Sequence, residues 1–428
     1  MPSIRKLWVL IFALVLGAFP LCAVTTSTDV RKALDQVASH AASRMATRGS
    51  LSGAEYAALL NDPSVYGDLR NLRTKTRDYA IGSVLEATRS SNNRKQVLTK
   101  ARSRVRKAGF PLRRNMNDAV ESFEPFARID FFPVDSPTLT ADATASTTGS
   151  WIGARVSIGI PCGSDVSLYL WELQPSATED APVNATLRFA REGALSRSGE
   201  GVDRQEFAIR WPEDGGAPEI ASIETGAWCS SLWRTATMSV LRSGEHPYRP
   251  ERLFQHQEPA FLDEGVLPTV ARTAQGFRFH FLTHYWLNPN QPRRLKDLDV
   301  QVQNDRASIT APASEDPLLF LDQWVSTPWQ ESRTWTTGEH ENALRTWHES
   351  LSPEAATKLE ASVVARGNCG RDTNTVWVQL QTQPGSGLSA QQNNGIFGIL
   401  KWQAGGFRVE RIVEQLPSGC PLTSAERQ

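Results

Sequence analysis

The chain has 428 residues, of which 40% are hydrophobic and 21% charged, with 13 Trp and a formal net charge of zero. This length is typical of two or three domains, and the composition excludes a wholly disordered or collagen-like chain. The zero net charge provides no overall positive field that would favour nucleic acid.

The N-terminal residues have the build of an export signal. Two basic residues precede an apolar run over residues 7–19. That run is shorter than the about 20 residues that a membrane-spanning helix needs. Ala23 is a plausible cleavage residue, whereas a lipid anchor on Cys22 and an uncleaved anchor are the alternatives. We therefore expect a signal peptide over residues 1–23 and a secreted or periplasmic protein.

Residues 24–133 are expected to form a helical, basic domain. Its first helix has one apolar face, and a longer helical segment follows Pro63. A last helix is expected from Asn92 to Lys107, with Gly109 ending it. Residues 24–114 contain 18 Lys and Arg against 7 Asp and Glu, so the rest of the chain is acidic. The apolar residues of the first helix are Val30, Leu34, Val37, Ala41 and Met45.

Positive charge is concentrated in the last of these helices, since no acidic residue lies between Glu86 and Asp118. Such a cluster can bind a protein or an anionic envelope component, or it can be a solvated face or one docked on the acidic part of the same chain. The helix has no aromatic residue on which bases could stack, which disfavours nucleic acid. The residues that would contact a partner are Arg94, Lys95, Lys100, Arg102, Arg104, Arg106 and Lys107.

Residues 134–150 are rich in Ser, Thr and Ala and predict a linker. After it, apolar residues alternate with polar ones, so residues 151–312 predict an antiparallel β-rich domain with a hairpin turn at Asn304-Asp305. If the linker separates two domains, the basic helix is not needed for folding of the β part. A chain starting near Ser150 would then fold.

Residues 313–421 predict a C-terminal domain of helices followed by a β-meander, and residues 422–428 a tail. Helices are expected around residues 318–325, around Leu344 and Trp347, and over residues 359–364. Gly405-Gly406 marks a hairpin between the last two strands. The fold class is therefore α+β, with an N-terminal all-α region, an antiparallel β-rich region and a C-terminal α+β domain.

Two stretches of the chain resemble each other and suggest an internal repeat. Cys162-Gly163-Ser164-Asp165 matches Cys369-Gly370-Arg371-Asp372, and each copy continues through similar strands to a final Cys. An exported chain can oxidise its thiols, and four Cys that remain after signal removal allow three pairings. The repeat favours one bridge within each copy, Cys162–Cys229 and Cys369–Cys420, over bridges that would join the two copies.

No metal, cofactor or catalytic motif stands out. His280 and His284 lie four residues apart on an expected strand, about 13 Å from each other, which is too far for one metal ion. Asp165 and Asp372 are the acids placed alike in the two copies, and they suit turn formation better than acid–base catalysis. We therefore expect no catalytic, cofactor-binding or metal-binding residue. The leading hypothesis is an exported, non-enzymatic binding or interaction protein, and the alternative is an envelope or secreted hydrolase with a spatially assembled site.

Overall fold

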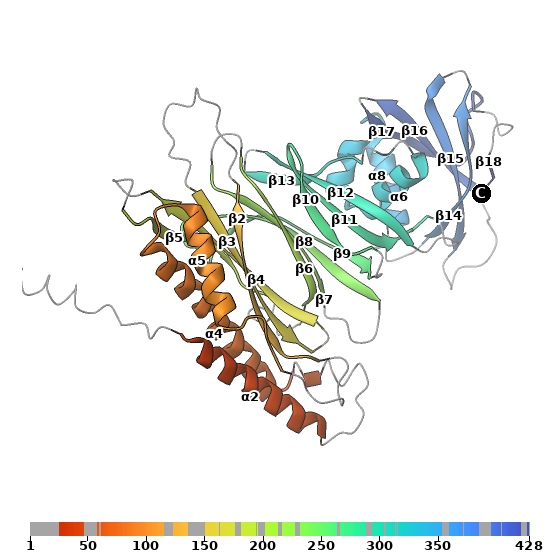
Figure 1. Cartoon of the computed structure of the whole chain (residues 1–428). Coiled ribbons are helices and arrows are strands. Elements are labelled where there is room, and N and C mark those ends of the chain that lie inside the picture. Colours follow the sequence, from red (N-terminus) through yellow and green to blue (C-terminus); the bar gives the residue numbers. More distant parts are fainter. Residues whose placement is uncertain are drawn as a thin grey trace, which may run out of the picture. The chain divides into compact units, whose positions relative to one another are not determined.

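A computed structural model describes residues 25–46, 58–59, 61–114, 123–135, 150–161, 163–175, 181–193, 195, 202–212, 216–226, 232–262, 266–287, 293–303, 305–312, 314, 316–352, 359–370, 372–384, 395–403, 405–420 and 426–427. The described residues up to 195 form one compact unit, and those from 202 onward form a second (Figure 1). The expected signal peptide, Cys162 and Cys229, and most of the expected linker lie outside the described residues.

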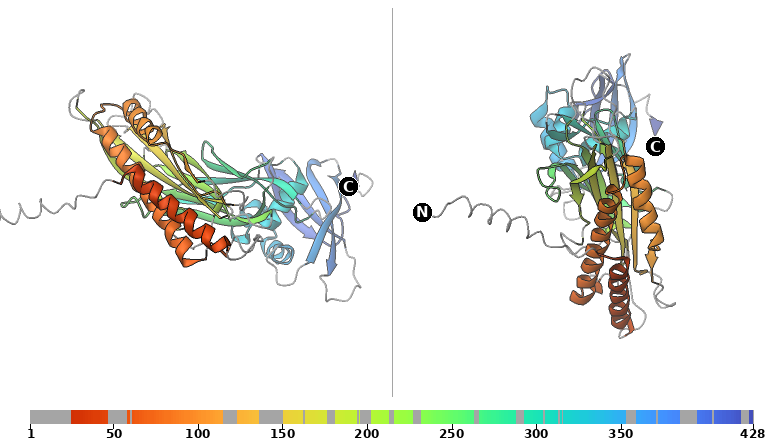
Figure 2. Two further views of the ribbon diagram at one scale, coloured as in Figure 1. Left: turned by 60° about the horizontal axis from the view of Figure 1, so that its bottom comes forward. Right: turned by 60° about the vertical axis from the view of Figure 1, so that its left-hand side comes forward.

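The first unit places three helices on one face of a five-stranded antiparallel sheet (Figure 2). The strand order is β1-β2-β3-β4-β5, so the strands follow one another as a meander. Asp62 caps the second helix by accepting from the backbone N–H groups of Ser64 and Val65, and Gly109 has a positive φ just after the third. The elements are α2 (Ser27–Ala46), α4 (Pro63–Thr88), α5 (Arg94–Lys107), β1 (Leu112–Arg113), β2 (Phe126–Val134), β3 (Ser150–Ile160), β4 (Gly163–Gln174) and β5 (Asn184–Arg191).

One hydrophobic core joins the helices of this unit to its sheet. All five apolar residues expected on one face of the first helix are buried in it, which confirms that prediction. Helix α5 adds a short apolar face, and alternate residues of β2, β3 and β4 face the helices. Representative members are Val37, Leu69, Val97, Ile129, Phe131, Ile152 and Trp171.

Because the helices and the sheet share this core, the domain boundaries differ from those expected from the sequence. The helical domain over residues 24–133 and the β-rich domain over 151–312 were expected to be separate, but β3 to β5 complete the core of the helices. The compact units instead divide near residue 201. The physical reason is that the apolar faces of the three helices share one core with the sheet, so the sheet forms the second layer that covers them. A chain starting at Ser150 would therefore lose β1 and β2 and expose the helix-facing side of β3 and β4.

The second unit contains an eight-stranded antiparallel sheet in the order β13-β12-β11-β9-β8-β7-β6, with β10 also paired to β11. The hairpin expected at Asn304-Asp305 is confirmed between β12 and β13, where Asp305 has a φ of 63°. The strands are β6 (Val202–Arg210), β7 (Glu219–Gly226), β8 (Trp233–Arg242), β9 (Glu251–Phe261), β10 (Thr269–Arg272), β11 (Gly276–His284), β12 (Arg293–Gln303) and β13 (Arg306–Ile309).

Helices and a second sheet complete this unit and share one core with the eight-stranded sheet. The helical elements are α6 (Pro317–Ser326), α7 (Trp329–Ser332), the 3₁₀ helix η2 (Arg333–Trp335) and α8 (Glu341–Leu351). The second sheet has the order β17-β16-β15-β14-β18. Its strands are β14 (Leu359–Cys369), β15 (Asp372–Pro384), β16 (Gly395–Gln403), β17 (Gly406–Val413) and β18 (Glu426–Arg427). The chain is thus α+β, in the order helices, antiparallel sheets, then helices with a meander.

The prediction of one helix in this region is wrong. Residues 359–364 begin strand β14, which pairs along its length with β15. The short apolar run there contains adjacent β-branched Val363 and Val364, which favour a strand. The hairpin at Gly405-Gly406 is confirmed, with Gly405 at a φ of 83°.

The structure contains the expected disulfide between Cys369 and Cys420, whose Cα atoms lie 3.9 Å apart. The repeat that suggested it is not a repeated module, however. In the second copy β14 to β17 form one sheet, whereas in the first copy β4 belongs to the five-stranded sheet and β6 and β7 belong to the eight-stranded sheet. Two hairpins correspond between the copies, β3–β4 with β14–β15 and β6–β7 with β16–β17, but those of the first copy lie in different sheets. Among the described residues, no helix combines the length and apolar character needed to cross a bilayer.

Candidate functional site

Two arginines of the basic helix α5 bind backbone atoms of β2. Arg94 Nη1 donates to the carbonyl oxygen of Val134 at 3.0 Å. Arg102 donates through Nε and Nη2 to the carbonyl oxygen of Phe131 at 3.0 and 2.8 Å. These side chains therefore help to hold α5 on the edge of the sheet rather than serving as free contacts for a partner.

Two further basic residues of α5 are engaged with the preceding segment. Lys100 Nζ donates to Ser90 Oγ at 3.0 Å, and Arg104 forms an ion pair with Glu86 of α4. The guanidinium of Arg104 also lies over the ring of Tyr79, 5.7 Å from its centroid. Four of the seven basic residues thus have contacts inside the first unit, with backbone carbonyls of β2, with Ser90 and with Glu86.

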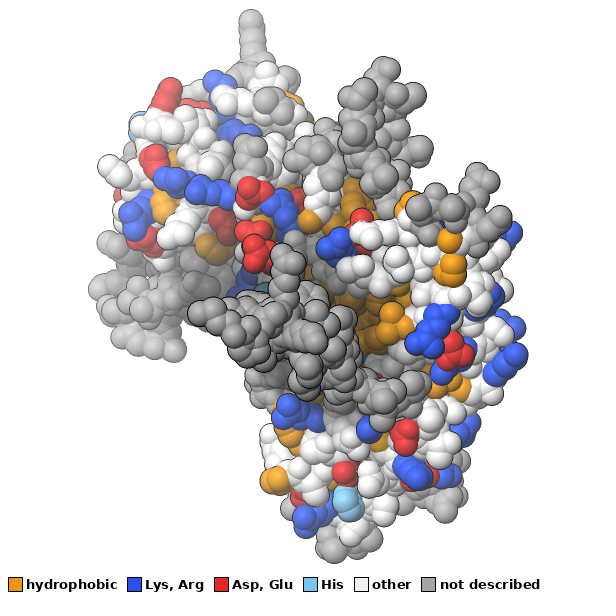
Figure 3. All heavy atoms as spheres, turned by 90° about the vertical axis from the view of Figure 1, so that its left-hand side faces the viewer, with side chains coloured by type: hydrophobic (Ala, Val, Ile, Leu, Met, Phe, Trp, Pro, Cys, Tyr) orange, Lys and Arg blue, Asp and Glu red, His pale blue; other side chains and the backbone are white. Residues whose placement is uncertain are grey.

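The other three basic residues of α5 are exposed. Lys95, Arg106 and Lys107 form no ion pair with any described residue. At 3.6 residues per turn they lie away from the buried side of the helix, which carries Val97 and Ala101. On the face that Figure 3 draws, basic side chains occur in small groups, several of them beside acidic ones.

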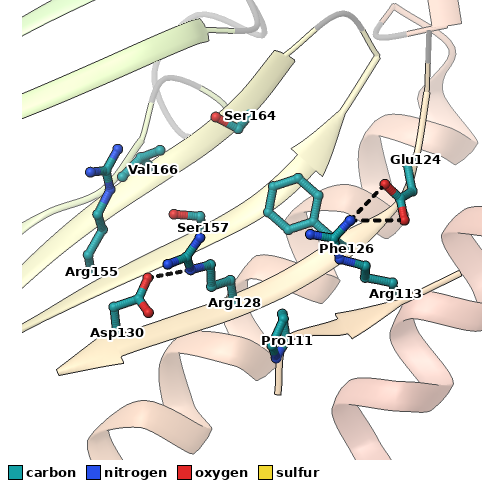
Figure 4. A pocket seen from close by; sticks show the side chains of 10 residues that line it. All are labelled: Pro111, Arg113, Glu124, Phe126, Arg128, Asp130, Arg155, Ser157, Ser164 and Val166. Carbon is teal, nitrogen blue, oxygen red and sulfur yellow. Dashed lines mark hydrogen bonds and ion pairs between the residues drawn. The ribbon is translucent and has the colours of Figure 1, made fainter. Parts of the chain in front are cut away.

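A pocket of about 310 Å³ lies on the face of the five-stranded sheet opposite the helices. It is open to solvent and is lined by residues of β1 to β4 and of the segments next to them (Figure 4). Three arginines project around it: Arg113 from β1, Arg128 from β2 and Arg155 from β3. This lining suits an anion, because guanidinium groups remain charged at all ordinary pH values and bind carboxylate and phosphate through paired N–H groups.

Two carboxylates of the same wall are paired with two of these arginines. Arg113 Nη1 lies 3.4 and 3.2 Å from the two oxygens of Glu124, and Arg128 Nε lies 2.6 Å from Asp130 Oδ2. The Arg113 and Arg128 side chains are 61% and 58% exposed. Pairs this exposed contribute about 0–1 kcal/mol, so their guanidinium groups can exchange one carboxylate partner for another.

Two of the residues that line the pocket, Ser157 and Ser164, have small side chains. Strand register places Ser157 of β3 directly between Arg128 of β2 and Val166 of β4. Next to it, Gly159 lets β2 approach closely, since a Cβ there would lie 2.4 Å from the carbonyl oxygen of Glu124 and 2.7 Å from the Phe126 ring. Phe126 therefore lies flat beside the pocket and supplies an apolar wall.

The second unit holds a buried ion pair. Its groups have shifted pKa values, as groups in functional sites often have, but they are not accessible to solvent. Lys296 Nζ of β12 donates to both carboxylate oxygens of Glu258 of β9, at 2.8 and 2.9 Å, and both residues are buried. Burial raises the pKa of Glu258, but the attraction of Lys296 and of nearby His256 outweighs burial and lowers it to about 2. Burial lowers the pKa of Lys296.

A second buried pair lies beside the first. Asp322 of α6 accepts from Arg294 of β12 and from the backbone N–H of Leu287, the latter at 2.9 Å. Burial raises the pKa of Asp322 against the attraction of Arg294. Perturbed groups of this kind can mark a catalytic centre. Here each charge faces its partner inside the core, and none of them lines the pocket on the first unit. The Asp322–Arg294 pair therefore holds α6 against the sheet, and the Lys296–Glu258 pair joins β12 to β9.

A Ser–His contact in the same unit does not have the geometry of a catalytic pair. His348 Nε2 lies 3.0 Å from Ser332 Oγ, and also 3.0 and 2.9 Å from the carbonyl oxygens of Trp324 and Thr327. Because carbonyl oxygens only accept, Nε2 carries the hydrogen and offers no lone pair for the serine proton. Burial also lowers the pKa of His348, which keeps the ring neutral.

The residues weighed for metal or acid–base chemistry have structural partners. His280 lies 2.6 Å from Asp297, and the His284 ring stacks on Trp233 at 3.7 Å. Asp165 is fully buried and accepts from the backbone N–H of Leu195 at 3.1 Å. The side chain of Asp372 lies outside the described residues. No cluster of three His, Cys, Asp or Glu side chains suited to a metal ion occurs in the described part of the chain.

Comparison of the chain with known proteins finds no matching family model, no matching curated protein and no matching solved structure.

Sequence reasoning missed the pocket, although one signal for it was present. Residues 126–134 alternate between apolar residues that face the core and a second set that contains Arg128 and Asp130. That pattern predicts a strand with a charged outer face. The position of Arg155 and Ser157 next to this face depends on strand register, for which the sequence carries no direct signal.

Proposed function

We propose that the protein is an exported, non-enzymatic binding protein of the cell envelope or extracellular space, and that the free side of α5 contacts an acidic partner. Export is supported by the basic, apolar and small-residue order of the first 23 positions. Mass spectrometry of the exported chain should place the first mature residue at or within a few residues of Val24. The observation that supports contact with a partner is the exposure of Lys95, Arg106 and Lys107.

The arrangement of the ionisable side chains favours a binding function over a hydrolytic one. Two of the perturbed acids lie in the core opposite their own partners, Glu258 opposite Lys296 and Asp322 opposite Arg294. His348 donates to carbonyl oxygens and is not arranged as a base for Ser332. The alternative of a hydrolase with a spatially assembled site therefore has no described group to act as nucleophile and base together.

An acidic polymer or protein surface suits α5 better than a lipid bilayer does. The solvent-facing positions of this helix are basic or small and polar, as at Lys95, Thr99 and Ser103. Helices that lie in a membrane interface combine such a face with large apolar residues that enter the acyl region, and the apolar residues of α5 are instead buried against the sheet. The proposed contact is therefore electrostatic and should weaken as salt is added.

We expect the mature protein to bind poly-L-glutamate at low ionic strength and to release it as salt rises. The triple variant Lys95→Gln/Arg106→Gln/Lys107→Gln should bind about tenfold more weakly, because three charge-assisted contacts are lost. Fluorescence anisotropy with labelled polyglutamate measures both values, and thermal unfolding checks that the variant is folded.

A matched variant controls for the change in net charge. Arg249→Gln/Arg252→Gln/Arg272→Gln removes three exposed arginines from the second unit and should leave the affinity within about twofold. Equal losses in both triple variants would show that only net charge matters. Absence of binding by the unaltered protein at low salt would also reject the proposed surface, as would preferential binding to anionic vesicles over polyglutamate.

A further inference from the structure

We infer that the outer face of the eight-stranded sheet, at strands β11 and β12, is a contact surface for a second copy of this chain. An apolar row crosses this face, because the register places each member directly opposite the next. Side chains that are directly opposite in antiparallel strands share a face and lie about 5 Å apart, so the row is continuous across four strands. Its members are Trp233 of β8, Phe261 of β9, Leu282 of β11 and Leu295 of β12.

The face that carries this row points away from the core of the second unit. Residues at alternate positions, Phe281 of β11 and Lys296 of β12, are buried. Leu282 is half-buried, and Leu295 is 48% exposed, more than any other large apolar side chain in the described part of the chain. A single exposed leucine needs no explanation, but a contiguous apolar row marks an interaction surface.

Aromatic and arginine side chains are packed together at one side of the row. The guanidinium of Arg293 lies 4.3 Å from the centroid of the Phe261 ring. The His284 ring stacks on Trp233 at 3.7 Å and lies 5.2 Å from Trp286. Such residues are enriched at the centres of protein interfaces and often carry most of the binding energy. Because they already contact one another, little conformational freedom is lost when a partner binds.

The charges on β12 select a second copy as the partner. Its outward-facing residues are Arg293, Leu295 and Asp297, so a basic and an acidic residue lie at equal distances on either side of Leu295. If two such faces pack about a twofold axis that runs along the apolar row, each strand meets its own copy in the opposite direction. Leu295 then packs on Leu295 of the partner subunit. Arg293 faces the partner subunit's Asp297, and this contact occurs twice.

The charged groups can form these contacts and keep the ones they have. Asp297 Oδ1 lies 2.6 Å from His280, whereas Oδ2 lies 4.0 Å from Arg278. A carboxylate has about four lone-pair sites and a guanidinium has five N–H donors, so neither group must be unpaired to gain a partner. Exposed pairs of this kind fix the orientation of two molecules more than they add affinity. Since the apolar row is small, we expect a weak dimer.

The test is sedimentation velocity of the full mature chain between about 5 and about 500 µM. We expect a shift from monomer to dimer as the concentration rises, without larger species. Leu295→Asp should weaken association by about tenfold or more, because it places two like charges at the twofold axis. Arg293→Asp and Asp297→Arg should each weaken it as well. The double variant Arg293→Asp/Asp297→Arg should recover most of the lost affinity, because opposite charges face each other again.

Leu85→Asp is the matched control, since Leu85 is 45% exposed but belongs to α4 of the first unit. It should leave association unchanged, and thermal unfolding should show that all variants are folded. The inference is overturned if the unaltered chain stays monomeric, if it forms larger species, or if Leu295→Asp associates equally well. An equal loss in Leu85→Asp, or no recovery in the double variant, overturns it too. None of these outcomes depends on the polyglutamate result, because α5 is not part of this surface.

Discussion

Replacement of Lys296 by methionine should lower the free energy of unfolding of the second unit by about 3–5 kcal/mol, because it leaves the buried carboxylate of Glu258 without its counter-charge. Lys296 is 1% exposed and contacts both oxygens of Glu258. Hydrogen exchange of the backbone amides in β9 and β12 measures the effect, and these amides should exchange at least about a hundredfold faster in the variant.

Two variants show whether the effect belongs to the unpaired charge. Lys296→Met/Glu258→Gln removes both charges and should recover much of the lost stability, since a buried pair replaced by neutral residues is often close to neutral. Arg278→Gln breaks the exposed pair with Asp299 on the same sheet and should cost less than about 1 kcal/mol. A loss below 1 kcal/mol in Lys296→Met would contradict the assignment of this pair as a main support of the core.

The same ion pair should make the second unit sensitive to acid. The pKa of Glu258 is about 2 in the folded protein and 4.5 for an ordinary glutamate. The unfolded chain therefore takes up this proton first, so the stabilisation is complete above about pH 4.5 and is lost as the pH falls toward 2. Measured unfolding free energies between pH 6 and pH 3 should fall less steeply for Glu258→Gln than for the unaltered protein. Parallel curves would show that Glu258 is not the group that titrates.

Loss of the Cys369–Cys420 bridge should destabilise the second unit by about 4 kcal/mol, the chain-entropy cost for a loop of 51 residues. The bridge joins the end of β14 to the segment after β17, on opposite sides of β15 and β16. It lies against a small apolar cluster that contains Trp377 and Phe397. Denaturant unfolding of Cys369→Ser/Cys420→Ser, compared with the oxidised protein, measures the change.

Peptide mapping without reductant provides the control for this bridge. Fragments that contain Cys369 should be linked to fragments that contain Cys420 and should separate when reductant is added. Unchanged stability in the double variant, or linkage of Cys369 to a different cysteine, would contradict the prediction. The second expected bridge, Cys162–Cys229, stays a prediction that the same map can decide.

Local patterns in the sequence were enough to predict many elements of the fold. The apolar spacing from Val30 to Met45 predicted the buried face of α2, and Asp305 and Gly405 stand where two hairpins turn. Each of these signals depends on neighbours within a few residues. The run at 359–364 was ambiguous for the same reason, since a short apolar run fits either a helix or a buried strand until its pairing with β15 is known.

Features that depend on distant residues could not be predicted in this way. The helices α2, α4 and α5 each show an apolar face, but the sequence does not say that β3 and β4 cover those faces. Lys296 and Glu258 are 38 residues apart and meet only because β9 and β12 lie in one sheet on either side of β11. The pocket likewise requires the register that places Ser157 opposite Arg128.

Each of the three described sheets has a very short strand at one of its edges: β1 with 2 residues, β13 with 4 and β18 with 2. An edge strand exposes unpaired backbone N–H and C=O groups, and a long one can serve as a template for a strand of another molecule. A strand of two to four residues offers too few such groups for stable pairing. These edges should therefore resist strand-by-strand association at high protein concentration, and an insertion that lengthens β13 would be expected to promote fibril-like aggregation.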